Sequence, residues 1–404
     1  MIKNISQLFI SNFIFGLSQL LIIICLNKFG NVVDVGNYTL GLAIVAPITV
    51  FLNMSLNLHY NTNKEETNFN DYFILRLMSS SLIIVISLIV GKILNYESYT
   101  LIIILLLASL KFIESVFEID YAYFQKKEEH YRIAYSKTIR SVFLILWIFV
   151  VAIFFKANLV LLIAGIIISN FILFFLYDFR KLSFNVDRPK ISFSKIRLII
   201  LTALPLAISS TFDSLNINAQ RILIDKILSI EELGIYASIM TIMVSGQIFI
   251  AAVMTYFLPK LNFYISNKMY SAFKKTLRTI VIVASVIGLI LIIGTYFFGE
   301  SILTLVYTKK YEGYDSLALL IMIAGMFWYI SGSLYYCLLS LNLYKTQMVV
   351  ILISFIIMIV STMVLVEKLG LEGAALSIIF SMVFRVIGFA VSIFLRLKKL
   401  NKSL

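Results

Sequence analysis

The chain has 404 residues, of which 61 % are hydrophobic and only 14 % are charged. A soluble domain carries roughly 45–50 % apolar and about 25 % charged residues. This composition excludes a water-soluble enzyme and indicates that lipid surrounds most of the surface. We therefore expect an all-α integral membrane protein.

Twelve stretches are apolar over about 20 residues, the length that a helix needs to cross the hydrocarbon core. Helices are expected because every backbone group must find its partner inside the span, and the runs are too long for barrel strands. The first stretch has no signal-peptide cleavage site, so we predict that it stays as an anchor. The predicted spans lie near 7–27, 38–58, 72–91, 99–124, 135–155, 158–178, 197–226, 233–258, 276–298, 314–341, 346–366 and 371–396.

The predicted connections are short and polar, as at 59–71, 125–132, 179–195 and 259–270. None is long enough to hold a soluble domain. A membrane polysaccharide polymerase or glycosyltransferase commonly carries a large outside loop with catalytic residues, and no such loop is present. The sequence therefore argues against an enzyme.

Histidine and cysteine are too few to indicate a metal or cofactor site. His59 and His130 are predicted in loops, and Cys25 and Cys337 lie in apolar stretches, where cysteine behaves as a small hydrophobe. We expect no metal, no cofactor and no catalytic residue.

Lys and Arg set the predicted orientation. With the N-terminus inside, the inside connections hold far more Lys and Arg than the outside ones, as the positive-inside rule requires. Both termini are thus predicted in the cytoplasm of a bacterial cell, with the chain in the inner membrane. The same basic connections explain the net charge of +13 through contacts with anionic membrane lipids, so no nucleic-acid partner is expected.

The basic connection 179–195 divides the chain into predicted halves, 1–178 and 196–404, with six helices each. A short repeat supports the division: Gly36-Asn37-Tyr38 and Gly234-Ile235-Tyr236 both follow acidic residues in outside turns. An even number of spans makes the two halves run the same way. This arrangement predicts parallel repeats around a central cavity, where a transporter binds its substrate.

Three short stretches resemble Wzx-type polysaccharide flippases. Residues 221–236 (RILIDKILSIEELGIY) are similar to the end of that family's seventh span and the turn after it, and 30–38 (GNVVDVGNY) to the matching first turn. Residues 369–375 (LGLEGAA) resemble a third landmark. The chain departs from the family in having Gln220 where an Asp is common.

The resemblance implies membership in the superfamily that also holds drug and toxin exporters and peptidoglycan lipid flippases. It implies a flippase that moves a lipid-diphosphate-linked oligosaccharide, such as an O-antigen or lipopolysaccharide precursor, beside other polysaccharide assembly proteins. A drug/ion antiporter of the same superfamily stays open as an alternative, and a membrane polymerase or glycosyltransferase is the alternative from another class. The first span lacks cations between Lys3 and Lys28, which argues against a lipid II flippase.

Charged residues inside spans are costly and usually face a cavity or a partner. Each of four cations is predicted to contact the substrate, and each has a structural alternative. For Arg385 the alternative is an internal ion pair, and for Arg76 it is snorkelling to the interface. For Arg221 the alternative is pairing with Asp225, and for Lys111 it is pairing with Glu114.

Four carboxylates are candidates for binding a coupling ion, with simple charge balance as the alternative. They are Glu114, Glu118, Asp213 and Asp225. Pro205 lies inside the seventh predicted span, where it removes a backbone hydrogen bond and kinks the helix. We predict a hinge for alternating access there, or else a static bend.

Overall fold

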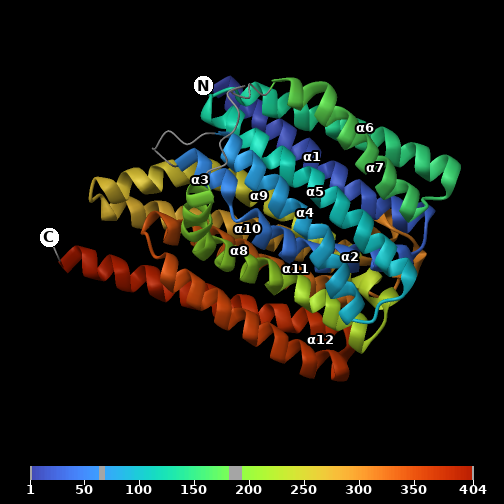
Figure 1. Cartoon of the computed structure of the whole chain (residues 1–404). Coiled ribbons are helices and arrows are strands. Elements are labelled where there is room, and N and C mark those ends of the chain that lie inside the picture. The colour runs from blue at the N-terminus through green and yellow to red at the C-terminus, as the bar shows by residue number, and fades with distance from the viewer. Residues whose placement is uncertain (1, 63–68, 182–192, 403–404) are drawn as a thin grey trace. The chain divides into compact units, whose positions relative to one another are not determined.

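The computed structural model describes residues 2–62, 69–181 and 193–402, and every regular element within them is a helix (Figure 1). The expected all-α membrane fold is therefore confirmed. The elements are α1 (Ile2–Phe29), α2 (Val32–Asn53), α3 (Leu56–Thr62), α4 (Phe69–Ile93), α5 (Ser98–Lys126), α6 (His130–Phe155), α7 (Leu159–Leu173), η1 (Phe174–Asp178), η2 (Phe179–Lys181), α8 (Phe193–Ile227), α9 (Ile230–Ser266), α10 (Tyr270–Val306), η3 (Lys309–Tyr311), α11 (Asp315–Ser340) and α12 (Tyr344–Lys402).

The last two predicted spans form α12, which changes direction at Gly370 (Figure 1). Gly370 has φ 58° and ψ −136°, a left-handed conformation that glycine adopts without a steric penalty. Ser381 Oγ donates to the carbonyl of Ser354 at 2.8 Å, and these residues belong to the two arms on either side of the turn. The two arms of α12 therefore pack as an antiparallel hairpin of two spans.

The chain forms two compact units, 1–222 and 223–404. In the first unit α5 packs against α2, α4, α6 and α7, and in the second α11 packs against α9, α10 and α12. Each of these central helices is the fourth span of its predicted half. Most of α8 belongs to the first unit. The predicted division of the chain into halves 1–178 and 196–404 stays a prediction, because most of the connection 179–195 lies outside the described residues.

The short repeat corresponds to two equivalent helix starts. Asn31 caps α2 by accepting a hydrogen bond from the Asp34 backbone N–H at 2.7 Å. Ser229 caps α9 in the same way, from the N–H of Glu232 at 3.1 Å. In both turns the capping residue satisfies an N–H that the helix leaves open, and the acid sits where the helix dipole favours it.

Three predicted loop positions are wrong, and one of them is His130, which is the first residue of α6. The predicted connection 259–270 is helical through Ser266, with Pro259 inside α9. Proline is tolerated in a membrane helix when neighbouring groups satisfy the freed carbonyl. His59 lies in α3, where Nδ1 is 2.7 Å from the Tyr72 hydroxyl and Nε2 is 2.9 Å from Thr202 Oγ1. His59 therefore connects α3 with α4 and α8.

Helix α8 bends by 50° between its segments 196–204 and 207–227. The bend falls at the sequence position of Pro205, as a missing backbone hydrogen bond would favour. The side chain of Pro205 lies outside the described residues, and its role as a hinge stays a prediction.

Candidate functional site

The charged stripe that the sequence predicts on α5 lies in the first unit. Lys111 Nζ is 2.7 Å from Glu114 Oε2, so the two side chains form an ion pair one turn apart. Their side chains keep 28 % and 19 % of their accessible surface. Glu118, one turn further, is exposed and accepts a hydrogen bond from Asn53 Nδ2 at 3.0 Å. The stripe is therefore both paired within itself and reachable by small ligands.

Arg140 of α6 adds a second cation to this ion pair. Its Nη2 lies 3.8 Å from Glu114 Oε1, and its side chain is only 5 % exposed. Its Nε donates to Asn170 Oδ1 at 3.0 Å, and its Cζ lies 4.0 Å from the centre of the Phe117 ring. Ion pair, hydrogen bond and cation–π contact together hold the guanidinium in one position.

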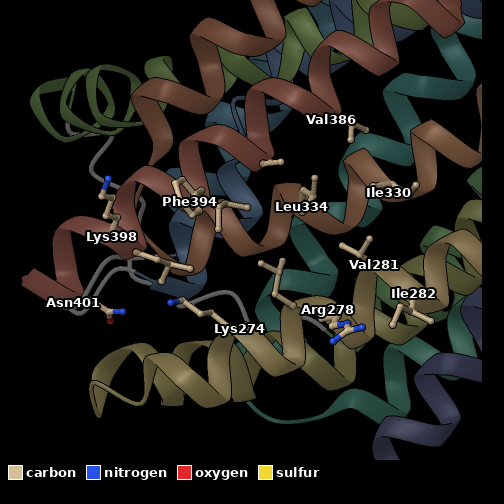
Figure 2. Close-up of a pocket in the computed structure, with 14 residues that line it drawn as sticks. Lys274, Arg278, Val281, Ile282, Ile330, Leu334, Val386, Phe394, Lys398 and Asn401 are labelled. Atoms are coloured by element: carbon tan, nitrogen blue, oxygen red, sulfur yellow. The ribbon is translucent and has the colours of Figure 1, made fainter.

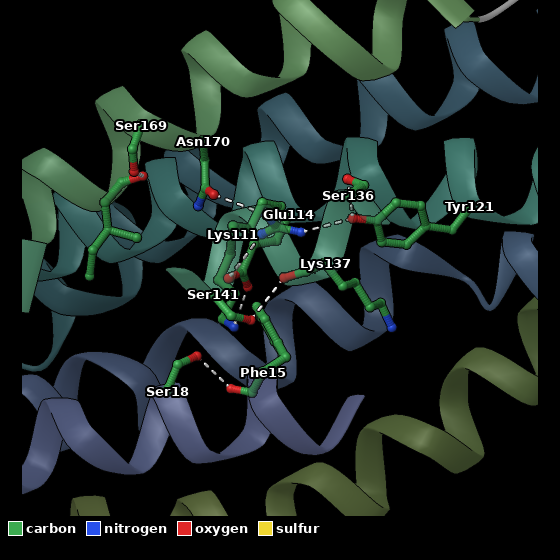
Figure 3. Close-up of polar contacts among 12 residues, drawn as sticks. Phe15, Ser18, Lys111, Glu114, Tyr121, Ser136, Lys137, Ser141, Ser169 and Asn170 are labelled. Atoms are coloured by element: carbon green, nitrogen blue, oxygen red, sulfur yellow. Dashed lines mark hydrogen bonds and ion pairs between the residues drawn. The ribbon is translucent and has the colours of Figure 1, made fainter. Parts of the chain in front are cut away.

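A chain of hydrogen bonds continues from Arg140 (Figure 3). Arg140 Nη1 donates to the Tyr121 hydroxyl at 3.4 Å, and this hydroxyl lies 2.9 Å from Ser136 Oγ. Ser136 Oγ in turn donates to Asp178 Oδ2 at 2.9 Å. The chain joins α5, α6 and η1 through buried polar groups, which strengthen one another in a low dielectric.

Arg76 of α4 is the largest fully buried side chain in the described part of the molecule, at 0 % exposure. Within that part none of its three guanidinium nitrogens has a hydrogen-bond partner, and neither carboxylate oxygen of the fully buried Asp120 has one. The charges of Glu118 and Asp120 act on Arg76. The expected alternative of snorkelling is therefore wrong for Arg76, whose side chain is fully buried inside the unit.

We call the six charged residues of α4, α5 and α6 described above the charge cluster. It holds three cations and three carboxylates, so its formal charge is zero. The members are Arg76, Lys111, Glu114, Glu118, Asp120 and Arg140.

Arg221 lies near the end of α8, at the edge of the first unit. Its Nη1 donates to Asn218 Oδ1 at 3.5 Å. The charges of Glu114 and Arg221 both act on the hydroxyl of buried Tyr38. The predicted pairing of Arg221 with Asp225 stays a prediction.

Arg385 lies in the second arm of α12, in the other unit. It is 5 % exposed, and its Cζ lies 5.5 Å from the centre of the Phe389 ring. It precedes the end of α12 by about 25 Å of helix, at 1.5 Å per residue. Arg385 is therefore held deep in its span, as the sequence predicts, and its contact with a substrate stays a prediction.

The remaining carboxylate candidates both lie on α8. Asp213 is half-buried in α8, and Asp225 lies near the end of the same helix. Their roles in ion coupling stay predictions. Within the described ranges, no group of three or more His, Cys, Asp or Glu side chains could hold a metal ion.

Sequence reasoning missed Arg140, Asp120 and Asp178 as site residues. Arg140 falls within the predicted span 135–155. A cation five residues inside a span was therefore the available signal. The partners Asn170 and Asp178 carry no such signal, because only the packing of α6 against α7 and η1 brings them close.

A family model described as "Polysaccharide biosynthesis protein" matches residues 31–316. The chain belongs to this family. The match covers both acidic turns and the whole charge cluster, and it confirms the resemblance to polysaccharide flippases at the level of the family.

One relative of this polysaccharide biosynthesis protein is the capsular polysaccharide biosynthesis protein CapF of Staphylococcus aureus. It is 28 % identical over 395 residues, which cover 96 % of this chain and 98 % of CapF. The chain therefore spans essentially the full length of that relative.

Solved structures show the same fold at low identity. An inward-facing multidrug resistance MATE transporter of the MOP superfamily matches with a TM-score of 0.70 and 13 % identity, over 100 % of this chain and 96 % of that one. The lipid II flippase MurJ in an inward closed conformation matches with a TM-score of 0.69 and 16 % identity, over 97 % and 89 %. This polysaccharide biosynthesis protein thus has the fold of multi-pass membrane transporters and flippases.

Proposed function

We propose that the chain is a flippase that carries a polyprenyl-diphosphate-linked oligosaccharide across the bacterial inner membrane. The observation that carries this proposal is the burial of arginines inside the spans of a polysaccharide biosynthesis protein, above all Arg76 at 0 % exposure, whose guanidinium has no hydrogen-bond partner among the described residues. A buried cation is costly unless an anion balances it. The planar fork of arginine binds the two oxygens of a phosphate at once, so a diphosphate suits these side chains.

The drug/ion antiporter is the second candidate, because multidrug transporters share the fold. A fold alone does not fix the substrate. The family match favours the oligosaccharide, since a cationic drug gains nothing from arginines. The enzyme alternative lacks support in the described connections, which are short turns such as those between α5 and α6 or α8 and α9.

Arg221 and Arg385 are expected to bind the diphosphate during transport. In cells that lack their own exporter, the wild-type chain should restore surface polysaccharide, and Arg221→Ala or Arg385→Ala should abolish it. Arg→Lys should restore part of the signal, because the charge remains but the fork is lost.

The matched control is Arg197→Ala, which removes an exposed arginine of α8. Membrane levels of each variant separate loss of transport from loss of the protein. Normal surface polysaccharide from both alanine variants would mean that the two arginines do not handle the substrate.

Glu118 is the carboxylate we favour for a coupling ion. Glu114 is already held by Lys111 and Arg140, whereas Glu118 is exposed and can exchange an ion. An inside-negative potential favours outward movement of the diphosphate by about 2.3 kcal/mol per charge per 100 mV. An ion that enters on Glu118 then resets the empty transporter.

In proteoliposomes, transport should therefore respond to an imposed potential and to a pH gradient. Glu118→Gln should remove the response to the ion gradient, and Glu128→Gln, at an exposed position beyond the end of α5, should leave it unchanged. Transport that ignored both gradients and needed added ATP would reject this mechanism.

We also propose that both termini and the connection 179–195 face the cytoplasm. A single cysteine at Lys190 or at the C-terminus should react with an impermeant thiol reagent only after the cells are opened. A cysteine at Lys309, in the exposed turn after α10, should react in intact cells. Labelling of the Lys190 variant in intact cells would contradict the proposed topology.

A further inference from the structure

The second unit carries a groove that is separate from the charge cluster of the first unit. Its volume is about 760 Å³, and it is lined by one face each of α10, α11 and the second arm of α12 (Figure 2). The lining positions recur every three or four residues along α10 and α12, as expected for two helix faces that diverge. Ile330 and Leu334 of α11 lie between them.

The lining is apolar over most of the groove. Ten of its fourteen residues are hydrophobic, and they extend from Leu277 to Ile282 on α10 and from Val386 to Leu397 on α12. Several remain open on the outer side, as Phe394 and Ile282 show at 65 % and 51 % exposure. An apolar groove of this kind, in a helix bundle that lies in a membrane, accepts a hydrocarbon chain.

One end of the groove is basic. Lys274, Arg278 and Lys398 are all exposed, and no acidic residue is among those that line the groove. Figure 2 shows Lys274, Lys398 and Asn401 toward one end, and Val386, Ile330 and Val281 toward the other. Arg278 lies one turn beyond Lys274 on α10, beside Ile282. The charges belong to the first turns of α10 and the last turns of α12, where the two helices leave the apolar layer.

The length of the groove matches one leaflet. From Val386 to Asn401, α12 rises by about 22 Å at 1.5 Å per residue. One leaflet contributes about 15 Å of hydrocarbon and a polar headgroup region beside it. A lipid with its phosphate at the basic end would therefore extend its chain along the apolar part.

We propose that this groove binds an anionic phospholipid of the membrane, with its phosphate at the end that Lys274 and Lys398 mark and with Arg278 one turn further along α10. The number of uncharged polar side chains in the lining distinguishes a phospholipid from the transported sugar lipid as the ligand. Asn401 is the one uncharged polar side chain in the lining, and an oligosaccharide needs many hydrogen-bond partners. A phosphate headgroup needs only the cations, so the groove suits a phospholipid.

Lipid binding to the purified full-length chain tests this site without any transport measurement. Native mass spectrometry of the chain in neutral detergent should show one tightly bound phosphatidylglycerol. Changing all three cations to Gln (Lys274, Arg278 and Lys398) should weaken that binding about a hundredfold, equivalent to about 3 kcal/mol at about 1 kcal/mol per cation. Phosphatidylcholine should bind at least tenfold more weakly than phosphatidylglycerol.

Two further variants separate the parts of the site. Changing Lys309, Lys310 and Lys368 to Gln removes equal charge from exposed turns of the same unit and should leave the affinity unchanged. Ala390→Trp fills the apolar part and should reduce binding at least tenfold while the cations remain. If this variant fails to fold, the surface variant with three changed cations still carries the test.

Three results would overturn the proposal. Equal binding of phosphatidylcholine and phosphatidylglycerol would show that the cations do not recognise a headgroup. Displacement of phosphatidylglycerol by polyprenyl monophosphate at lower concentration would assign the groove to the transported lipid. A dimer that Ala390→Trp converts into a monomer would make the groove an interface between two copies.

Discussion

Arg140→Ala is expected to lower the free energy of unfolding by about 3 kcal/mol, the low end of the range for removing one partner of a buried ion pair. Glu114 keeps its pairing with Lys111 at 2.7 Å, which limits the loss. Asn170 Oδ1 and the Tyr121 hydroxyl lose their cationic donor, and the Phe117 ring loses its contact. A buried polar group that loses its hydrogen-bond partner destabilises the fold by more than the hydrogen bond had stabilised it.

Thermal unfolding of the purified variant in detergent measures this loss. Arg197→Ala changes an exposed arginine of α8 and should stay within about 0.5 kcal/mol of the wild type. Arg140→Lys should lie between the two, since it keeps the charge without the fork. An Arg140→Ala variant as stable as Arg197→Ala would mean that Arg140 does not stabilise the first unit.

Gly373→Ala is expected to disrupt the hairpin of α12 at a cost of about 3 kcal/mol, the upper end for overpacking. A Cβ at position 373 would lie 2.1 Å from the Leu365 carbonyl oxygen and 2.4 Å from its carbon. Both atoms belong to the backbone, so the two arms would have to separate. Because Arg385 lies on the second arm, surface polysaccharide should also fall.

Gly294→Ala is the matched control, because a Cβ there meets no atom within 4 Å. This change in α10 should be neutral or slightly stabilising, as alanine reduces the entropy of the unfolded chain. The thermal midpoints of both variants and their levels in the membrane provide the comparison. Equal midpoints would contradict the close approach of the two arms at Gly373.

The spans could be predicted from the sequence because a membrane imposes one length and one polarity on every crossing helix. The LGLEGAA stretch at 369–375 also encodes a local feature of the structure, the turn between the two arms of α12. Gly370 supplies the left-handed turn, and Gly373 allows the close approach behind it. These features depend on residues that are neighbours in the sequence.

The charge cluster could be predicted only in part. Lys111 and Glu114 are one turn apart on the same helix, so their pairing follows from spacing alone. Arg140 and Glu114 come from different helices, and no period in the sequence reveals that α6 brings them within 3.8 Å. Arg76 also looked able to reach the interface from its position in the span, whereas packing around α4 buries it completely.

Movement of a labelled lipid across a membrane tests the proposed function most directly. Proteoliposomes with the purified chain would receive a fluorescent polyprenyl-diphosphate oligosaccharide in both leaflets, and an impermeant quencher would report how much reaches the outer one. We expect nearly all of the lipid to become accessible with the wild-type chain and only half of it with Arg385→Ala or without protein. If half stayed protected with the wild-type chain, in the presence of a membrane potential, the chain would not be a flippase for this lipid.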